Sequence, residues 1–405
     1  MSTPTPRRTG NTLSKPAAFF LQASIILFFL ASSSAPTPLY VVYQAAWGFS
    51  PVTITVVFGI YAVAVLATLL VVGSLSDYVG RRPVLLAATL LQACAMGVFA
   101  TAHGVGSLLL ARVVQGVATG VAAGAVGAGM LDIDRARGTV ANAVAPMVGT
   151  ATGGLMSGLM AQHLPAPTVL IYLMFGAIFL VQAVGVALMP ESAARRPGAR
   201  QSLRPKLWLP PAARAPTLLA APVLIATWAL VGFYGSLGPS LVRRLAGSSS
   251  LVLGGAVLFV MAASGAVTVL LSGARPARTI LLTGSAALMA GVALTLIGTA
   301  LGSVALFFVG TAVAGAGFGS GFQGAIRTVV PLAAPHERAG VLSVLYVIAY
   351  LSMGVPAVFV GVRVVHGAAL FTAAREYGFA VIALAAAAMA GTVARAHPSP
   401  ARQPV

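Results

Sequence analysis

The chain alternates between long apolar runs and short polar gaps. Twelve runs approach the roughly 20 residues that a helix needs to cross the hydrocarbon core of a bilayer. They fall near 18–40, 51–73, 83–102, 107–130, 139–162, 167–189, 217–240, 250–273, 279–300, 303–328, 340–364 and 372–394. Pro and Gly interrupt several runs, which membrane helices tolerate because neighbouring helices bond the freed backbone groups. The pattern predicts an all-α membrane protein with about 12 transmembrane helices.

The composition indicates that lipid is the main solvent of this chain. Of its 405 residues, 59% are hydrophobic and only 7% are charged, whereas a soluble domain carries about 25% charged residues to face water. The first apolar run follows Arg7, Arg8 and Lys15 and contains the small residues 31–35, as in a secretory signal peptide. A cleaved signal is therefore the alternative, but a count of twelve requires an uncleaved first helix.

The net charge of +18 invites a comparison with nucleic-acid-binding proteins, which gather cations on one face of a soluble domain. Nearly all Lys and Arg instead lie between the apolar runs, so no nucleic acid is expected as a partner. Cytoplasmic loops of membrane proteins are rich in Lys and Arg. If both termini are cytoplasmic, 19 Lys and Arg lie on that side and four lie outside, namely Arg243, Arg244, Arg363 and Arg375. The sequence thus predicts a multi-pass inner-membrane protein with both termini in the cytoplasm.

The longest polar segment, residues 191–216, contains six Lys and Arg and divides the runs six and six. It predicts a cytoplasmic tail (1–17), a first six-helix bundle (18–190), a basic cytoplasmic linker (191–216), a second six-helix bundle (217–394) and a second cytoplasmic tail (395–405). The linker is expected to fix the topology, with contact to anionic lipids as a secondary role.

Short segments recur in the two halves. Gly80-Arg81-Arg82-Pro83 opens the third run, and Gly273-Ala274-Arg275-Pro276 precedes the ninth. Residues 107–110 and 303–306 each begin with serine and open a glycine-rich run. Parallel repeats of this kind predict two bundles related by an axis along the membrane normal. A chance match in sequence rich in Gly and Ala is the alternative.

Between the second and third runs the sequence reads Gly73-Ser74-Leu75-Ser76-Asp77-Tyr78-Val79-Gly80-Arg81-Arg82. This segment closely resembles the signature loop of the major facilitator superfamily (MFS), Gly-x-Leu-x-Asp-x-x-Gly-Arg-Arg/Lys. The helix count, the chain length and the central basic loop extend the resemblance over nearly the whole chain. It implies the MFS fold and transport by alternating access between two bundles.

The residues of this loop suit a latch at the membrane edge. Gly73 and Gly80 lack a Cβ, so helix ends can approach closely and the chain can turn. An unpaired Asp77 carboxylate at the membrane edge would cost free energy, and Arg81 and Arg82 are the nearest cations in the sequence. In the resembling family the loop latches the two halves in the outward-open state, which implies this role for Asp77 and Arg81. The alternative is a turn that only sets the topology.

Arg112 is the only charge well inside an apolar run, and a charge within the membrane is a candidate functional residue. Together with Gln115 it forms a segment that resembles a second family pattern, Arg-x-x-Gln-Gly on helix four, where the arginine is tied to coupling or substrate binding. The two residues are three apart and share a helical face. The repeat places Phe308 at the equivalent position of the tenth run. The alternative is an arginine that snorkels to the outer interface.

The fifth run contains Asn142, Pro146, Gly149, Gly153 and Gly154. This stretch loosely resembles the antiporter signature of drug exporters, although an alanine stands where the signature has glycine before proline. Asn142 is a candidate coupling or substrate residue, and Pro146 is a candidate kink. The glycines allow tight helix packing, and packing alone is the alternative explanation.

Proton-coupled members of the resembling family carry Asp or Glu in helices one, four or five, and this chain has none there. Coupling through Asp77 or Asp132, substrate exchange and facilitated diffusion stay open, with protons as one candidate coupling ion. Arg112 also favours an anionic substrate. The polar and aromatic candidates for a cavity wall are Gln22, Tyr40, Tyr43, Trp228, Tyr234, Gln323, Tyr346 and Tyr350. Trp and Tyr also gather at the headgroup level, which is the alternative for the aromatic ones.

The sequence offers little chemistry for an enzyme. The single cysteine and five histidines lack metal-ligand spacing, and no nucleophile elbow or phosphate-binding loop is present, so neither metal nor cofactor is expected. We predict a secondary transporter that moves a small molecule by alternating access, with efflux of drug-like or amphiphilic compounds favoured. The alternatives are uptake or exchange of a sugar or organic anion and, more distantly, a membrane-embedded enzyme or receptor.

Overall fold

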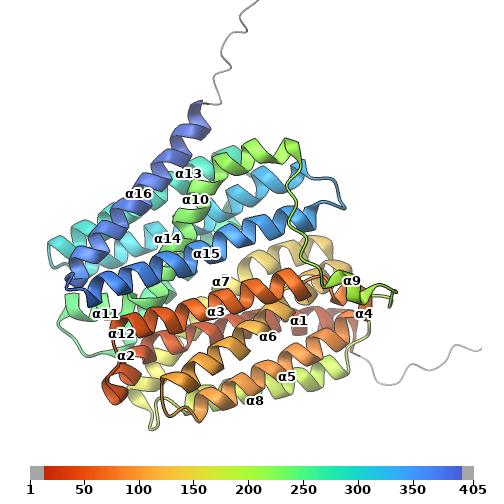
Figure 1. Ribbon diagram of the computed structural model, residues 1–405, viewed down its shortest axis with the longest axis horizontal. Coiled ribbons are helices and arrows are strands. Elements are labelled where there is room, and N and C mark those ends of the chain that lie inside the picture. Colours follow the sequence, from red (N-terminus) through yellow and green to blue (C-terminus); the bar gives the residue numbers. More distant parts are fainter. Residues whose placement is uncertain (1–12, 395–405) are drawn as a thin grey trace, which may run out of the picture.

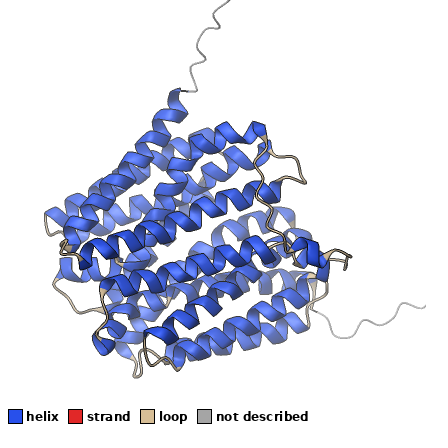
Figure 2. Ribbon diagram, in the orientation of Figure 1, coloured by secondary structure: helices blue, strands red, loops and turns tan. Residues whose placement is uncertain are grey.

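The computed structural model describes residues 13–394, so most of the predicted tail 1–17 and the whole of the tail 395–405 lie outside the described part. Within residues 13–394 the chain is helical and has no strand (Figure 2). Twelve helices are long and apolar enough to cross a membrane. The predicted all-α membrane fold is therefore confirmed.

The helices of the first half are α1 (Lys15–Ser34), α2 (Pro36–Trp47), α3 (Pro51–Val72), α4 (Ser76–Val79), α5 (Arg81–Ala100), α6 (Val105–Ile133), α7 (Arg135–His163) and α8 (Leu170–Ala187). The linker holds α9 (Ala199–Ser202). The helices of the second half are α10 (Pro211–Ser236), α11 (Gly238–Ala246), α12 (Leu251–Leu271), α13 (Ala277–Ala300), α14 (Val304–Val329), η1 (Val330–Leu332), α15 (Arg338–Val365) and α16 (Leu370–Ala394). The first membrane span comprises α1 and α2 together.

Two predicted boundaries differ from the structure. α1 begins at Lys15 rather than at residue 18, because the Ser14 hydroxyl caps the helix by accepting a hydrogen bond from the Ala17 amide (3.4 Å). α10 begins at Pro211, inside the predicted linker 191–216. Proline is favoured at the first helical position, where its missing N–H costs no hydrogen bond. The linker is therefore shorter than predicted.

The two halves pack in the same way. α3 packs against α6 as α12 packs against α14, and α5 packs against α8 as α13 packs against α16. Likewise, α1 packs against α7 as α10 packs against α15. In Figure 1, α5 and α8 lie along the lower edge of the molecule, and α13 and α16 lie near the upper edge. These matching contacts support the predicted pair of six-helix bundles.

The bundles meet along two helix pairs, α7 with α12 and α3 with α15. Glycines let these helices come close: a Cβ on Gly255 would overlap the Gly154 carbonyl oxygen, and a Cβ on Gly361 would overlap the Thr55 side chain. Small residues serve this purpose in membranes, where van der Waals packing rather than the hydrophobic effect holds helices together. The interface between the bundles is thus a packed one.

The two ends of the molecule are joined differently. We call them the α4 end and the α11 end; they lie at the right and left of Figure 1. Within residues 13–394, every hydrogen bond between the bundles lies at the α11 end. Thr37 Oγ1 donates to the Gly235 carbonyl (3.0 Å), and Gln162 Oε1 accepts from Ser250 Oγ (2.7 Å) and from the Val252 amide (3.2 Å). The bundles are therefore closed against each other at the α11 end.

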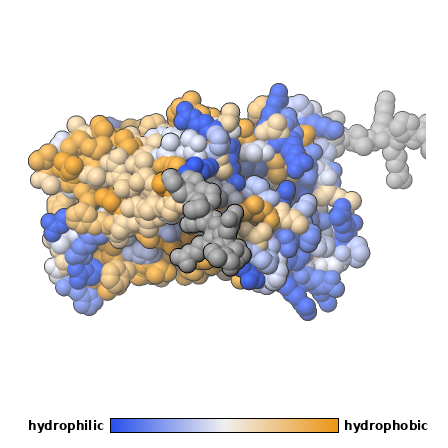
Figure 3. All heavy atoms as spheres, turned by 90° about the horizontal axis from the view of Figure 1, so that it is seen from above, coloured by the Kyte–Doolittle hydropathy of each residue, from blue (hydrophilic) through white to orange (hydrophobic). Residues whose placement is uncertain are grey.

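Loops that the charge pattern assigned to one side of the membrane lie together at the α4 end. The Arg196 amide of the linker donates to the Tyr78 carbonyl (2.8 Å), which joins the linker to the signature loop. Trp208 Nε1 donates to Glu337 Oε1 (3.0 Å), which joins the linker to the start of α15. Figure 3 shows hydrophilic side chains gathered at this end and hydrophobic ones over much of the rest of that face. The surface is that of a protein embedded in lipid.

The packing predicts the effect of a single methyl group. A Cβ on Gly153 would overlap the backbone of Ala31 in α1, so Gly153→Ala pushes α1 and α7 apart. Overpacking of this kind costs about 1–3 kcal/mol, and we expect a lower thermal unfolding temperature for the purified variant in detergent. Gly97→Ala is the control, because nothing lies within 4 Å of its Cβ. Equal unfolding temperatures for the two variants would contradict this close packing.

Candidate functional site

Arg81 holds the loop between α3 and α5 in place. Its guanidinium contacts the Asp77 carboxylate and donates to Asp132 Oδ2 (3.2 Å) and to Ser76 Oγ (2.7 Å). Arg81 is 7% exposed, whereas both carboxylates stay partly exposed. Asp132 belongs to the last turn of α6, so one side chain joins the loop to a further helix. The structure thus brings together Asp77 and Arg81, the two residues proposed for a latch.

Glu191 completes this loop, and the sequence analysis did not single it out. Its carboxylate accepts hydrogen bonds from the amides of Arg81 (2.7 Å) and Arg82 (3.2 Å), which begin α5. The helix dipole favours an anion at this position. Gly80 has φ +104°, and a Cβ there would overlap the Glu191 carboxylate, so glycine is required. One feature of the sequence indicates that another residue caps α5: Gly80, which precedes this helix, has no side chain that could do so.

Gly73 lies where the end of α3 meets α6. A Cβ on Gly124 of α6 would overlap the Gly73 carbonyl oxygen, so the two backbones nearly touch. Ser74 Oγ donates to the carbonyl of Ser202 in α9 (3.2 Å). The side chain of Arg82 is exposed and donates to a carbonyl near the end of α8. The loop and the start of α5 therefore contact α6, α8 and the linker.

Arg112 is enclosed within the first bundle, with no exposed surface (0%). Its Nε donates to Tyr40 Oη (3.1 Å), and its Nη1 donates to Gln115 Oε1 (2.7 Å) and to the Ser33 carbonyl (2.9 Å). Three aromatic rings lie with centroids 5.2–5.9 Å from the guanidinium carbon, those of Tyr40, Tyr61 and Phe99. No carboxylate of the described residues pairs with it. Neutral oxygens and aromatic faces hold the cation, which does not snorkel.

Arg112 and Gln115 bond to carbonyls at the break between α1 and α2. Pro36 has no N–H, so the carbonyl of Ser32, four residues earlier, loses its helical partner. Gln115 Nε2 donates to that carbonyl (3.1 Å), and Arg112 donates to the next one, of Ser33. Gln115 thus replaces the donor that the proline removes, as the membrane interior requires, and Arg112 bonds the neighbouring carbonyl at the break.

The candidates on α7 make packing contacts. Asn142 Nδ2 donates to a carbonyl of α6 (3.0 Å), and Pro146 lies within an α7 that the structure shows as one helix. Gly149 and Gly153 face α1, whereas Gly154 faces α12 of the second bundle. One glycine-rich helix therefore contacts both the first membrane span and the opposite bundle.

The eight candidates for a cavity wall fall into two groups. Four are buried in their own bundles: Gln22, Tyr40, Tyr43 and Tyr234. The hydroxyl of Tyr43 bonds to Tyr172 (3.2 Å), and that of Tyr234 bonds to Thr311 (3.1 Å). The other four remain partly exposed on α10, α14 and α15: Trp228, Gln323, Tyr346 and Tyr350. Only the second group has free surface to offer a solute in this arrangement.

Trp228 lies at the centre of an aromatic cluster in the second bundle. Its ring lies 5.1 Å from Tyr350, 5.5 Å from Phe322 and 6.5 Å from Phe318. The cluster continues to Tyr61 on α3, which also faces Arg112. Phe318 and Phe322 were missed in the sequence, although their spacing of four places them on one face of α14. Tyr61 connects the two candidate regions.

Two buried polar atoms of the candidates on α10 and α14 have no hydrogen-bond partner within residues 13–394. They are Trp228 Nε1, a donor, and Gln323 Oε1, an acceptor. Buried polar groups are nearly always hydrogen-bonded, and each exception calls for an explanation. A donor and an acceptor are thus available on the second bundle.

The six carboxylates of the chain avoid the middle of the helices. Five lie at the α4 end, and Glu376 lies at the α11 end, where it pairs with Arg363 (3.0 Å). Within the described residues, no carboxylate stands ready to carry a proton through the membrane interior.

The match to known proteins covers most of the chain. The sequence matches the Major Facilitator Superfamily over residues 23–358. The chain belongs to this superfamily. It is a membrane transporter and not an enzyme. No curated protein matches the sequence.

Solved structures share the MFS fold. Two crystal structures of nucleoside transporter NupG superpose with TM-scores of 0.71 and 0.67 at 13% and 14% identity, covering 93% of this chain and 99% and 98% of theirs. A bacterial homolog to human lysosomal transporter Spinster, in an inward-facing and unoccupied conformation, gives a TM-score of 0.71 at 15% identity, covering 96% of this chain and 99% of its own. At such identities the likeness shows the fold alone.

The setting of Arg112 predicts what its replacement does. Arg112→Ala leaves the Ser33 carbonyl and the Tyr40 hydroxyl without their donor, and each unsatisfied buried group costs about 1–3 kcal/mol. We expect a clearly lower unfolding temperature and loss of transport in proteoliposomes. Arg112→Lys keeps the charge but not the planar fork of donors, so it should recover only part of both. Parental stability and transport in both variants would show that this bonding is dispensable.

Proposed function

We propose that this MFS protein is a secondary transporter that exports drug-like, amphiphilic compounds by alternating access. The observation that carries the proposal is the aromatic cluster around Trp228, whose Nε1 has no hydrogen-bond partner in the described residues. Ligand sites are mostly apolar and aromatic, with a few polar groups that orient the ligand. Offset or edge-to-face ring contacts suit a flat apolar solute.

The charges support a solute that is uncharged or nearly so. Arg112 uses its donors on Tyr40, Ser33 and Gln115 and is sealed from the bundle interface. An organic anion would have to break these bonds to pair with it, at the cost of burying unsatisfied groups. No carboxylate lies beside Trp228 to pair with a cation either.

Alternating access is supported by the unequal ends of the molecule. Hydrogen bonds between the bundles occur at the α11 end, and the latch residues Asp77 and Arg81 lie at the α4 end. A solute bound between the two would be exposed to one side at a time as the bundles rock. The glycine-rich α7, with its resemblance to the exporter signature, supports the export direction.

Uptake is the second candidate function, with a sugar or a nucleoside as the solute. The likeness in fold to nucleoside transporter NupG favours it, and a nucleoside carries both a flat ring and hydrogen-bonding groups. The same cluster of Trp228, Tyr350 and Phe322 could stack on its base.

A transport assay separates these candidates. In everted membrane vesicles, where export appears as accumulation, we expect a fluorescent amphiphile to accumulate, and we expect no protein-dependent movement of radiolabelled uridine in right-side-out vesicles. Trp228→Ala should lower the initial rate about tenfold, the loss of a stacking contact worth roughly 1 kcal/mol plus a hydrogen bond. Trp228→Phe should retain part of the rate.

Phe359→Ala is the matched control, since Phe359 is 66% exposed on the outer surface of α15. It should transport at the parental rate. Uptake of uridine that Trp228→Ala abolishes would favour the second candidate. Unchanged transport of every solute in Trp228→Ala would remove the cluster from the solute site.

The latch gives a separate prediction. Asp77→Asn removes one of the two carboxylates that the Arg81 guanidinium contacts and leaves it with Asp132. We expect the protein to accumulate in the membrane as before and the transport rate to fall about fivefold or more, the range of a modest conformational coupling. Glu376→Gln removes a partly exposed carboxylate at the α11 end and should leave the rate unchanged. A fully active Asp77→Asn would leave the loop as a topological turn.

A further inference from the structure

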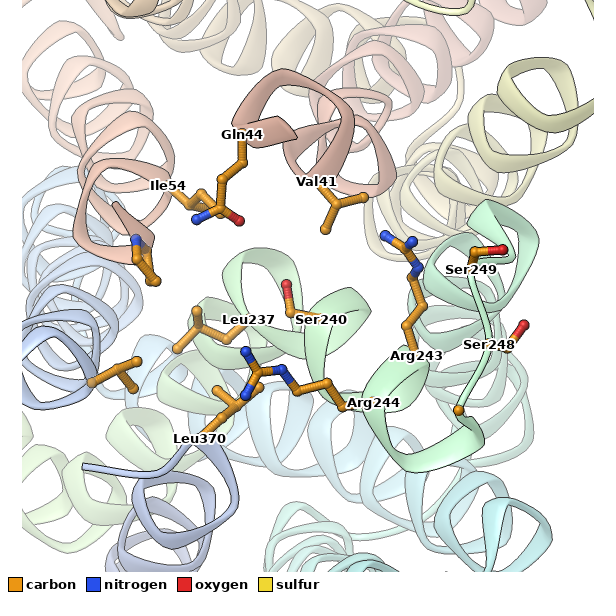
Figure 4. Close-up of a pocket in the computed structure, with 13 residues that line it drawn as sticks. Val41, Gln44, Ile54, Leu237, Ser240, Arg243, Arg244, Ser248, Ser249 and Leu370 are labelled. Atoms are coloured by element: carbon orange, nitrogen blue, oxygen red, sulfur yellow. The ribbon is translucent and has the colours of Figure 1, made fainter. Parts of the chain in front are cut away.

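A cavity of about 480 Å³ lies at the α11 end, where the two bundles meet (Figure 4). Its walls come from α2 and the start of α3 in the first bundle, and from α11, the end of α15 and the start of α16 in the second. Cavities of roughly 300–1,000 Å³ hold small molecules. The cavity is distinct from the aromatic cluster, because Trp228 and its neighbours are not among its walls.

Two arginines supply the charge of this cavity. Arg243 and Arg244 belong to the last turn of α11. In Figure 4 the Arg243 side chain extends toward Val41, whereas the Arg244 side chain extends toward Leu237 and Leu370. Arg243 is partly buried, and its Nε has no hydrogen-bond partner in the described part of the chain. Neither arginine makes an ion pair within residues 13–394. The cavity thus presents two cations that the protein does not neutralise.

The rest of the α11 end offers these arginines no carboxylate. Among residues 13–394, Glu376 is the one acid at this end, and both of its oxygens lie 3.0 Å from Arg363. Burial lowers the pKa of Arg243, because removal of water disfavours the charged form. An anion in the cavity would offset that loss by pairing with the guanidinium.

Part of the wall is apolar. Ile54 of α3, Leu237 at the start of α11, Val364 of α15 and Leu370 of α16 contribute to it. Ser240 and Gln44 add neutral hydrogen-bonding groups to the lining. The cavity therefore combines cationic, neutral polar and apolar side chains.

We propose that this cavity binds a small amphiphilic organic anion, with its charged group on Arg243 and its apolar part against Ile54 and Leu370, while Arg244 adds positive potential. The site is separate from the proposed solute site and does not depend on which solute is carried. Both bundles line it, so an occupant binds the arrangement that is closed at the α11 end more tightly than one in which the walls have separated. Such a ligand shifts the balance toward the closed arrangement by its difference in affinity.

Binding can be measured without any transport. We would reconstitute the full chain in nanodiscs of zwitterionic lipid and record ¹⁹F NMR titrations of 4-fluorobenzoate and of its neutral analogue 4-fluorobenzamide. The anion should bind at least about tenfold more tightly than the amide, as expected for a charge-assisted pair. Its affinity should fall as sodium chloride rises, because ions screen exposed charges.

Variants locate the site. Arg243→Gln should weaken binding of 4-fluorobenzoate about tenfold, whereas Arg243→Lys should retain most of it. Arg375→Gln is the control, because Arg375 is exposed at the same end, outside the cavity wall. It removes the same charge and should leave the affinity unchanged.

A second nanodisc of phosphatidylglycerol separates two sources of the anion. If this lipid competes with 4-fluorobenzoate, an anionic headgroup is the occupant, and if the affinity is unchanged, the occupant is a dissolved anion. Equal binding of the amide and the anion would overturn the proposal. Parental affinity in Arg243→Gln would also overturn the proposal. If that variant does not fold, the salt titration of the parent is the test, and an affinity that does not change with salt would overturn the proposal.

Discussion

The membrane interior offers no water to the backbone, so every carbonyl that a proline frees must find a donor within the protein. Pro36 creates that demand in the first membrane span, and α6 meets it with Gln115 and Arg112. Arginine suits the position because its planar group can bond the Ser33 carbonyl, Gln115 and Tyr40 together. On this account, Arg112 is retained in the membrane without a carboxylate partner because it supports the interrupted first span.

The same break organises the contact between the bundles. The first span of each half is interrupted near the α11 end, at Ala35 in one and at Leu237 in the other. Thr37, just beyond the first break, donates to the Gly235 carbonyl, just before the second (3.0 Å). The two interrupted helices therefore meet each other directly. Arg112 stiffens one of them, while the repeat places an apolar Phe308 at its position in the other half, so the halves are equivalent in packing and different in chemistry.

The fold was predictable because its signals are long and local. Twelve long apolar runs are more than a soluble domain carries. The loop around Asp77 lies between the second and third runs, as in the resembling family. Arg112 was predictable as a site because one charge stands out in an apolar run. The capping of α5 by Glu191 and the packing of Phe318 and Phe322 against Trp228 were not predictable, because both depend on which distant segments of the chain meet. Half of the cavity candidates, Tyr43 among them, are buried in their own bundles. The sequence could not show this, because the identity of a polar or aromatic residue on a helix does not reveal which way it faces.

The balance between the two ends bears on what drives transport. Three hydrogen bonds join the bundles at the α11 end within the described residues, and each contributes about 0.5–1.5 kcal/mol net. At the α4 end Arg81 pairs with Asp77 and Asp132 within the first bundle, so these ion pairs do not join the two bundles. The hydrogen bonds between the bundles thus amount to a few kcal/mol, which a modestly bound solute or anion can supply through its difference in affinity for the two arrangements. A carrier built in this way can switch on ligand binding alone, so the lack of a carboxylate in the middle of its helices is compatible with solute exchange.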